Sequence, residues 1–520
     1  MSARALDEAW VSPPPGRGGT LRVAVAYPNS YWVGMSNLGY QAVLRAFLER
    51  PGFDVRRVFW EKQGLWFPDG GRSLSEFHVV VFSVSYQPDL VHLHRMLEAG
   101  RTAEGRAASG MPVIAGGGVA LTLNPEVVSP LLDLIVIGDS EPCLPGIMDA
   151  LLSWGGSDAV EGLLDHLGTL PSCYLPARYG VEADPAGIYQ IPFPKGGAPG
   201  AIRRAVLSQL DDNPARPAAV SRRTEFASLY LLEVSRGCGE GCAFCAASAV
   251  CGPVRFLGYR KFEEEMERGL RYRKRIGFVG TAVSYHPKLL EMAGRVVGEG
   301  GGFSPSSIRL ERLGEPLAEL LAASGHRTVS VAPEAGREEL RASVGKPFSD
   351  GEVLRAIEVL QGAGIPNIKL YFMVGLPRET DADAAAIVHM VREIRERVIG
   401  AGRVKGKVGT VTVSVNPLVP KPQTPLERMP MAGEDVLNRR LAIVREGLGP
   451  IGGVSVQTGS IRAAYLDALL SLGDRGTGSS LERLPAKGLS LKRLVKTIPA
   501  AEGVLFGREK SELPWKMFSR

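Results

Sequence analysis

The feature that most constrains the fold is a repeated alternation of short apolar runs with stretches of helical spacing along the 520 residues. Apolar runs of strand length that lack polar alternation are typical of strands buried on both faces, and such strands form parallel sheets with helical crossovers. A first series of runs lies at LRVAVAYP (21–28), FHVVVFSVS (77–85), MPVIAGGG (111–118) and LDLIVIGDS (132–140). We therefore predict an α/β protein whose residues 21–154 form a doubly wound, Rossmann-like domain, with a ligand crevice at the carboxyl ends of its strands.

A second series of β/α units begins at residue 228. Strands are predicted at 228–235, 275–283, 306–312, 328–336, 367–377 and 409–420, with helical segments between them. Six such units predict a (β/α)6 partial TIM barrel over residues 226–445, with its active site at the carboxyl ends of the strands. The remaining parts are expected to be a flexible arm (1–20), a linker (155–225) and a small C-terminal extension with a basic tail (446–520).

Composition and charge exclude several classes of protein. A hydrophobic content of 45% and a charged content of 22% are ordinary for a globular chain. No apolar run reaches the length of about 18 residues that a membrane span needs, and the N-terminus lacks the apolar segment of a signal peptide, so we expect a cytoplasmic protein. The net charge is +6, of which residues 486–520 carry +5 (eight Lys or Arg against three Glu), leaving +1 for the rest. The balanced body gives no argument for nucleic-acid binding, and the tail is expected to be a docked helix with a solvated basic face.

The cysteines are unevenly distributed. Cys143 and Cys173 are isolated, whereas Cys238, Cys242 and Cys245 have the spacing C-x3-C-x2-C directly after a predicted strand. Such a cluster in a cytoplasmic chain indicates metal binding or catalysis rather than a disulfide framework. Three thiolates on a short loop can bind three irons of a 4Fe-4S cluster and leave the fourth iron open.

Two other kinds of metal site, a structural zinc site and an electron-transfer cluster, would require a fourth ligand. A structural zinc site usually has four protein ligands, and an electron-transfer cluster usually has four cysteines. Cys251 could be that ligand on spacing alone, although a buried thiol is the role expected for it. Gly237, Gly239 and Gly241 are expected to let the loop wrap closely around a cluster, because glycine tolerates positive φ.

The cysteine loop, with Phe244 before its third cysteine, resembles the C-x3-C-x-aromatic-C signature of the radical S-adenosylmethionine enzymes. In that family too the motif follows the first barrel strand. The resemblance implies a 4Fe-4S cluster on Cys238, Cys242 and Cys245, whose open iron chelates the amine and carboxylate of S-adenosylmethionine. Reductive cleavage of the cofactor would then give a 5′-deoxyadenosyl radical, with electrons from an external donor such as flavodoxin or ferredoxin.

Further segments match the family in the same order along the chain. Gly280 and Thr281 match a glycine-rich turn near the methionine amino group, although the usual acidic residue is absent. Arg309 is the candidate for a polar contact to the ribose or carboxylate of the cofactor. Glu334, in VAPEAG, resembles the "ESG" segment of the cobalamin-associated subgroup. For Arg309 and Glu334 the alternative is a structural salt bridge.

Two more positions complete this likeness. GLPRET (375–380) resembles the subgroup's "GxPGET" strand ending, with Arg378 in the place of the usual glycine. Lys346, in VGKP, matches a lysine that is common after the preceding strand, whereas Lys369 is expected to be a solvated or barrel-end charge.

The first domain resembles the cobalamin-binding-type domain that precedes the barrel in one large radical subgroup, through residues 27–43 and 115–142. The Asp-x-His-x-x-Gly motif, which supplies a histidine to cobalt, is absent, and the loop after the first strand reads NSYWVGMSNLG. Bound cobalamin and an emptied domain used as a scaffold therefore both stay open. The candidate cobalamin-binding residues are Ser83, Ser85, Gly116, Gly117, Gly118 and Thr122.

Among the histidines, His92 and His94 are expected to be ordinary, partly buried residues, because on a helix they do not share one face. His286, beside the proposed cofactor turn, is the histidine most worth testing. The resemblance predicts a radical S-adenosylmethionine enzyme, with cobalamin-dependent methyl transfer to an unactivated carbon as the leading reaction. Radical cyclisation, rearrangement or sulfur insertion without cobalamin, and a non-catalytic iron–sulfur or corrinoid-binding protein, are the alternatives.

Overall fold

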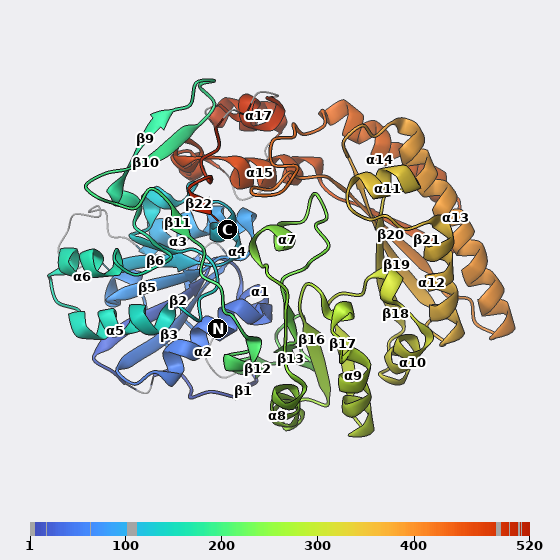
Figure 1. The fold of residues 1–520 in the computed structure, drawn as a ribbon, viewed down its shortest axis with the longest axis horizontal. Helices are drawn as coiled ribbons and strands as arrows, with labels where there is room; N and C mark the ends of the chain where they lie inside the picture. The colour runs from blue at the N-terminus through green and yellow to red at the C-terminus, as the bar shows by residue number, and fades with distance from the viewer. Residues whose placement is uncertain are drawn as a thin grey trace. The chain divides into compact units, whose positions relative to one another are not determined.

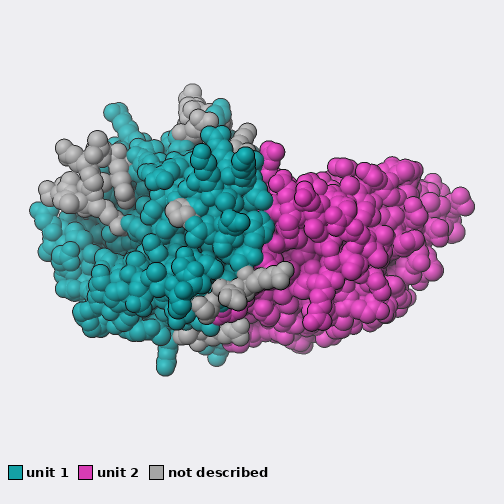
Figure 2. Space-filling view, turned by 90° about the horizontal axis from the view of Figure 1, so that it is seen from above, with its two compact units in different colours: residues 1–231, 466–520 teal, residues 232–465 magenta. Residues whose placement is uncertain are grey.

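A computed structural model describes residues 6–16, 18–62, 64–100, 112–484, 490–498, 500–507, 510 and 512–519. The chain divides into two compact units (Figures 1 and 2): unit 1 comprises residues 1–231 and 466–520, and unit 2 comprises residues 232–465. Among the described residues, no helix is both long enough and apolar enough to cross a membrane.

The main sheet of unit 1 has seven strands in the order β4-β3-β2-β5-β6-β7-β8. Its strands are β2 (Leu21–Tyr27), β3 (Phe53–Glu61), β4 (Gly64–Trp66), β5 (Val79–Ser83), β6 (Val113–Gly117), β7 (Leu134–Val136) and β8 (Cys173–Tyr174). The five inner strands are parallel, and β4 and β8 pair antiparallel at the two edges. The predicted Rossmann-like fold is therefore confirmed. Because the chain changes direction in the sheet between β2 and β5, the carboxyl ends of these two strands mark the expected crevice.

Helices cover the sheet as the apolar spacing predicts. α2 (Leu38–Glu49) and α5 (Leu144–Trp154) contribute Leu44, Phe47 and Ile147 to one apolar core with strands β2 and β3. α1 (Tyr31–Ser36), α3 (Leu90–Gly100) and α4 (Val119–Leu123) follow β2, β5 and β6 in turn. The loops and helix starts after these strands therefore share the carboxyl edge of the sheet.

The predicted arm and linker differ from what the structure contains. Within the arm, β1 (Glu8–Trp10) pairs antiparallel with β12 (Ala219–Ser221). The buried guanidinium of Arg57 contacts both Glu8 and Asp69, which ties this segment to the sheet. The linker 155–225 folds as α6 (Val160–Leu167), β8, β9 (Tyr179–Ala183), β10 (Gln190–Pro194), β11 (Ile202–Arg203) and β12.

The C-terminal extension is divided between the two units. β21 (Val454–Thr458) pairs with a barrel strand, whereas residues 466–520 belong to unit 1. There the Asn124 amide donates to the carbonyls of Ser471 and Gly473, at 3.0 and 2.8 Å, and Arg475 pairs with the buried Glu126 at 2.8 Å. α15 (Ile461–Leu472) begins in unit 2 and continues into this segment. The segment also contains α17 (Leu491–Thr497), α18 (Ala501–Phe506) and β22 (Phe518–Ser519). In the basic tail, α17 buries Leu494 and exposes its charged residues, while residues 487–489 lie outside the described residues.

Unit 2 holds two sheets. One consists of β13 (Leu229–Glu233), β16 (Arg275–Val279) and β17 (Gly302–Pro305), and the other of β18 (Thr328–Glu334), β19 (Asn367–Val374), β20 (Val411–Pro417) and β21. The second sheet is parallel throughout. Its connecting helices include α12 (Asp350–Gly362), α13 (Asp381–Val404) and α14 (Glu434–Leu448), which cover one of its faces (Figure 1). Between β16 and β18 lie α9 (Leu289–Gly298) and α10 (Glu315–Ala323), and α8 (Tyr259–Leu270) precedes β16.

The predicted strand over 306–312 is wrong. The strand lies earlier, at β17, and residues 310–312 form a 3-10 turn. The physical reason is that Phe303 supplies the buried apolar side chain, whereas Pro305 and the two serines after it cannot continue a buried run. The parallel α/β class of the barrel is confirmed, and β21 adds a strand that the six-unit prediction did not contain.

Candidate functional site

The cysteine loop follows β13 and the short β14 (Ser235–Arg236) and ends at α7 (Ala246–Val250). Gly237 and Gly241 have positive φ, at +80° and +64°, whereas Gly239 does not. A Cβ at Gly237 would lie 2.5 Å from the carbonyl oxygen of Pro253, so this position requires glycine. The loop therefore turns sharply at two of the three predicted glycines.

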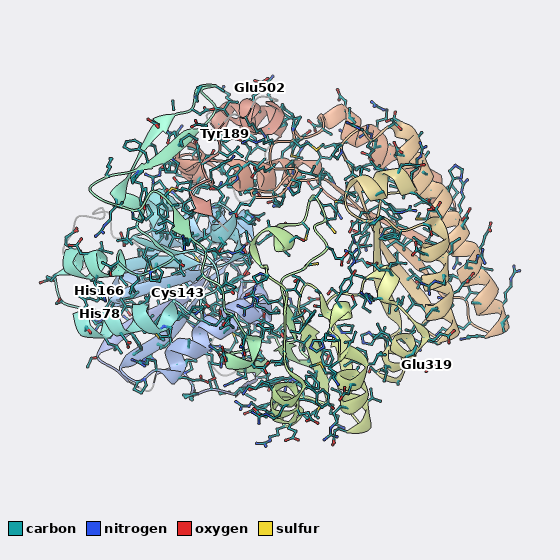
Figure 3. The ribbon with its side chains drawn as sticks, in the orientation of Figure 1. His78, Cys143, His166, Tyr189, Glu319 and Glu502 are labelled. Atoms are coloured by element: carbon teal, nitrogen blue, oxygen red, sulfur yellow. The ribbon has the colours of Figure 1, made fainter. Side chains whose placement is uncertain are left out.

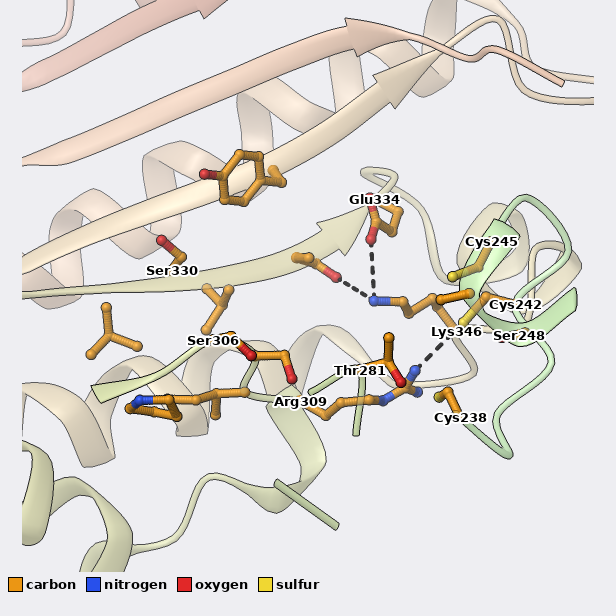
Figure 4. Close-up of a pocket in the computed structure, with 18 of the residues that line it drawn as sticks. Cys238, Cys242, Cys245, Ser248, Thr281, Ser306, Arg309, Ser330, Glu334 and Lys346 are labelled. Carbon is orange, nitrogen blue, oxygen red and sulfur yellow. Dashed lines mark hydrogen bonds and ion pairs between the residues drawn. The ribbon is translucent and has the colours of Figure 1, made fainter. Parts of the chain in front are cut away.

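Cys238, Cys242 and Cys245 line a single cavity of about 510 Å³ in unit 2 (Figure 4). Cys242 is buried and the other two are half-buried, while Cys251 is not among the residues that line the cavity. Within the described ranges, no three His, Cys, Asp or Glu side chains converge closely enough to hold one metal ion. In a 4Fe-4S cluster each thiolate binds a different iron, so its ligands need not converge on one point. Three thiols around one cavity therefore fit a cluster.

Arg309 contacts the cysteine loop directly. Its Nη1 donates to Sγ of Cys242 at 3.5 Å, and its Nη2 lies 3.3 Å from Oε2 of Glu240, within the same loop. Its Nε pairs with Oε1 of Glu311 at 2.7 Å. Burial raises the pKa of the Cys242 thiol, and the positive charges of Arg309 and Lys346 oppose that rise. The side chain predicted to contact the cofactor thus also contacts a predicted cluster ligand.

Glu334 ends β18 on the opposite wall of the cavity. It pairs with Nζ of Lys346 at 3.2 Å, and the same Nζ donates to the Ala332 carbonyl at 3.2 Å. Burial raises the pKa of Glu334, and the charge of Lys346 opposes the rise. Glu334 also has φ of +71°, a conformation that non-glycine residues adopt mostly where the surroundings impose it. The salt-bridge alternative is therefore present here, with both partners facing the cavity (Figure 4).

Gly280 and Thr281 directly follow β16 and contact the start of the cysteine loop. A Cβ at Gly280 would lie 2.1 Å from Oγ and 2.5 Å from the carbonyl oxygen of Ser235. The hydroxyl of Thr281 donates to the Gly237 carbonyl at 2.6 Å, and the hydroxyl of Ser306 donates to the Gly280 carbonyl at 2.9 Å. Close packing on Ser235 and the hydrogen bond to Gly237 thus fix this turn against the start of the loop, and Ser306 ties it to the residues that follow β17.

Phe244 lines the cavity and packs against an apolar cluster that includes Leu376 and Leu418. The GLPRET segment folds on itself, since Glu379 accepts hydrogen bonds from the backbone N–H groups of Gly375 and Leu376. Arg378 has φ of +59°, at the position where the resemblance expects glycine. Arg378 therefore adopts the left-handed backbone conformation that glycine adopts most easily, although it is not glycine.

His286 has a structural role. Its Nε2 lies 2.9 Å from the Leu257 carbonyl, and its Nδ1 accepts from the N–H of Lys288 at 3.0 Å. Both ring nitrogens are thus used by the backbone, and the histidine singled out for testing is not free to act on a cofactor. His92 and His94 are partly buried. Nδ1 of His92 lies 3.1 Å from the Pro28 carbonyl, and Nδ1 of His94 lies 3.3 Å from Oε2 of Glu98.

In unit 1 the candidate cobalamin residues lie at the carboxyl ends of β5 and β6. Ser83 is buried, and Ser85 accepts a hydrogen bond from the Asn37 amide at 3.0 Å.

The glycines at the end of β6 bring two loops together. A Cβ at Gly118 would lie 2.4 Å from the Val84 carbonyl, so this glycine serves the close approach of two loops. Gly116 and Gly117 end β6 beside it. Thr122 is buried and accepts from the N–H of Gly138 at 3.0 Å.

The prediction from sequence missed Asp89, which lies just after β5 at this same edge. Its Oδ1 accepts from the Asn29 amide at 2.7 Å, whereas its buried Oδ2 has no hydrogen-bond partner among the described residues. Burial raises the pKa of Asp89 to about 6. Trp32, Tyr86 and Val119, which follow β2, β5 and β6, are exposed to 47%, 53% and 38%. No spacing motif marked these residues, because the loops that carry them meet only in the folded sheet.

The comparison with known families agrees with this geometry. Residues 232–391 match the family described as Radical SAM superfamily, and residues 42–176 match Radical SAM proteins, N-terminal. The chain is a radical SAM superfamily protein with the N-terminal domain of that group, and it is an enzyme of this class. The family implies a 4Fe-4S cluster and S-adenosylmethionine as cofactors.

Individual relatives are distant. The chain is 25% identical over 412 residues to an uncharacterized protein of Methanocaldococcus jannaschii, covering 78% of this chain and 79% of that protein. It is 26% identical over 344 residues to the ribosomal protein uS12 methylthiotransferase RimO of Salinispora tropica, covering 59% of this chain and 65% of RimO. The fold is similar to that of the radical S-adenosylmethionine methyltransferase TsrM of Kitasatospora setae, with a TM-score of 0.52 and 15% identity over 79% of this chain and 74% of TsrM.

Proposed function

We propose that this radical SAM enzyme binds its 4Fe-4S cluster through Cys238, Cys242 and Cys245 and its S-adenosylmethionine in the adjoining cavity. The observation that carries the proposal is that three thiols of one loop line a single cavity whose walls also present Thr281, Arg309 and Glu334. When bound, cluster and cofactor together supply a 5′-deoxyadenosyl radical.

The chain's own residues position these groups. Thr281 holds the loop through the Gly237 carbonyl, and Arg309 holds it through Cys242 and Glu240. Glu334 is the carboxylate facing the cavity, where it can accept a hydrogen bond from the cofactor's amine. The pairing of Glu334 with Lys346 keeps its charge compensated until then.

We further propose that the carboxyl edge of the unit 1 sheet binds cobalamin, which would supply a methyl group. The support is of two kinds. TsrM, whose fold is similar, was solved with cobalamin and a 4Fe-4S cluster bound. At the edge itself, exposed Trp32 and Tyr86 offer apolar surface to a flat ligand. The proposed reaction is methyl transfer to an unactivated carbon.

The likeness to RimO favours sulfur insertion as a second candidate reaction. Sulfur insertion needs a sulfur donor near the substrate. In unit 1, Cys143 and Cys173 lie in the apolar core, where burial raises their pKa values to about 11 and about 12 (Figure 3 marks Cys143). Such inert thiols are poorly suited to that role, and the similarity of the fold to that of TsrM keeps methyl transfer as the leading candidate.

The experiment is anaerobic reconstitution with iron, sulfide and hydroxocobalamin, followed by dithionite and S-adenosylmethionine. We expect 5′-deoxyadenosine, and about one cobalt per chain after gel filtration. Cleavage without retained cobalt would overturn the methyl-transfer proposal and favour sulfur insertion or rearrangement. No 5′-deoxyadenosine with the cluster intact would overturn the radical reaction altogether.

A further inference from the structure

One face of the β18–β21 sheet is polar. Along β18, β19 and β20 every second residue is buried and apolar, as in Val331, Leu370 and Val413. Because successive side chains of a strand point to opposite faces, the residues between these form the second face, which we call the inner wall. The inner wall includes Ser330, Lys369, Tyr371, Thr412, Ser414 and Gln457.

The strand register aligns these side chains in two rows. Ser330 lies opposite Lys369, which lies opposite Thr412. In the next row Tyr371 lies opposite Ser414, which lies opposite Gln457. The interiors of closed barrels are filled by bulky branched apolar side chains. A wall of hydroxyl, amide and ammonium groups that stay partly or fully exposed is instead suited to a polar ligand.

Lys369 is the positively charged group of this wall, whereas Glu334 at the end of β18 is paired with Lys346. Its Nζ lies 5.0 Å from the centroid of the Tyr371 ring, and Tyr371 and Ser330 both line the cavity that contains the cysteines (Figure 4 labels Ser330). Within the part of the chain that the structure describes, Lys369 has no carboxylate at ion-pair distance.

The two cations that line the cavity, Arg309 and Lys346, are already compensated. Arg309 pairs with Glu240 and Glu311, and Lys346 pairs with Glu334. Lys369 therefore keeps a half-buried positive charge whose desolvation an incoming anion would compensate.

We infer that the substrate of the radical reaction carries an anionic group, a carboxylate or a phosphate, that binds Lys369 on the inner wall. The flanking hydroxyl and amide groups of Ser330, Ser414 and Gln457 would take hydrogen bonds from other polar groups of the substrate. This inference rests on the proposed function, since it takes the barrel cavity as the site of the radical reaction.

The test uses the reconstituted enzyme with S-adenosylmethionine and a defined library of metabolites. Each carboxylate in the library is matched by its amide and each phosphate ester by its free alcohol. Retention of each compound after ultrafiltration is measured by mass spectrometry for the wild type, Lys369→Gln, Lys369→Arg and the control Lys407→Gln, whose lysine is exposed on a loop of unit 2. Cluster content is measured in every variant as a check of folding.

We expect the wild type to retain anionic compounds about tenfold or more above their neutral partners, as for one charge-assisted hydrogen bond. Lys369→Gln should lose this preference, while Lys369→Arg and Lys407→Gln keep it. The matched pairs show whether the group is a carboxylate or a phosphate. Equal retention of neutral partners, an unchanged preference in Lys369→Gln, or no retained anion would overturn the inference. The wild type's 5′-deoxyadenosine formation is assayed in parallel, so a failure of the radical reaction is seen separately from a failure of anion recognition.

Discussion

Nη1 of Arg309 lies 3.5 Å from Sγ of Cys242, while Nη2 of the same guanidinium lies 3.3 Å from the carboxylate of Glu240. One side chain therefore contacts a proposed cluster ligand and the loop that carries it. Arg312, three residues on, stacks over the same Tyr285 ring as Arg309, but it has no described contact to the loop. The two arginines form a matched pair for experiment.

Arg309→Gln is expected to lower the cluster content after reconstitution and to make the midpoint potential of the remaining cluster more negative, because hydrogen bonds to cluster sulfurs raise the potential. The expected shift is on the order of 60 mV, the one-electron equivalent of about 1.4 kcal/mol. Redox titration followed by electron paramagnetic resonance measures it. Arg312→Gln should leave the potential unchanged, and equal shifts in both variants would refute a specific role for Arg309.

Gly280→Ala is expected to destabilise unit 2 by about 2 kcal/mol or more, because the new Cβ would meet the backbone and hydroxyl of Ser235. Gly294→Ala is the control. It lies in α9, and its Cβ would have nothing within 4 Å, so this change should stabilise the helix by up to about 1 kcal/mol. Urea unfolding checks both values, and a Gly280→Ala protein as stable as the wild type would show that this turn is not closely packed.

The raised pKa of Asp89 predicts that the free energy of unfolding depends on pH. Burial raises its pKa from 3.8 to about 6, so the folded state binds more protons than the unfolded state between these values. Stability contributed by this group is therefore present at low pH and is lost as pH rises toward 6, by up to about 3 kcal/mol. Asp89→Asn should be more stable than the wild type above pH 6 and closer to it near pH 4.

The free energy of unfolding, measured across that pH range, checks this prediction. Asp149→Asn, at a surface pair with Arg50, is the control and should show no comparable pH-dependent gain. A constant difference between Asp89→Asn and the wild type at all pH values would contradict the raised pKa.

Trp32→Ala is expected to weaken hydroxocobalamin binding about tenfold, because the ring offers apolar surface at the proposed cobalamin site. Phe193→Ala removes an aromatic ring of comparable exposure, 37%, from β10, which lies outside the main sheet. It should not change the affinity. A spectrophotometric titration measures both, and equal losses would argue against binding at the carboxyl edge.

The fold could be predicted from sequence because the inner strands of unit 1 are continuous apolar runs and the strands β18 to β20 of unit 2 have an apolar residue at every second position, with helical segments between the strands. The strand at β17 was misplaced because one buried phenylalanine is a weak signal beside a longer mixed run at 306–312. β21 was missed because none of its five residues is buried, so it lacks an apolar run.

The site could be predicted only where its residues are adjacent in sequence, as in the cysteine loop. The contact of Arg309 with Cys242 joins residues 67 positions apart and has no local signature. Lys369 was interpreted as a solvated or barrel-end charge, whereas the register places it in a row of the inner wall. Asp89 was missed because its unpartnered oxygen depends on how two loops meet at the sheet edge.

The most direct test of the account is the 5′-deoxyadenosine yield per reconstituted chain in four single cysteine variants. Cys238→Ala, Cys242→Ala and Cys245→Ala should each lose the 4Fe-4S cluster and the cleavage of S-adenosylmethionine. Cys251→Ala, whose cysteine does not line the cavity, should keep both. Retained cleavage in any of the first three variants, or its loss in Cys251→Ala alone, would contradict the assignment of the cluster to this loop.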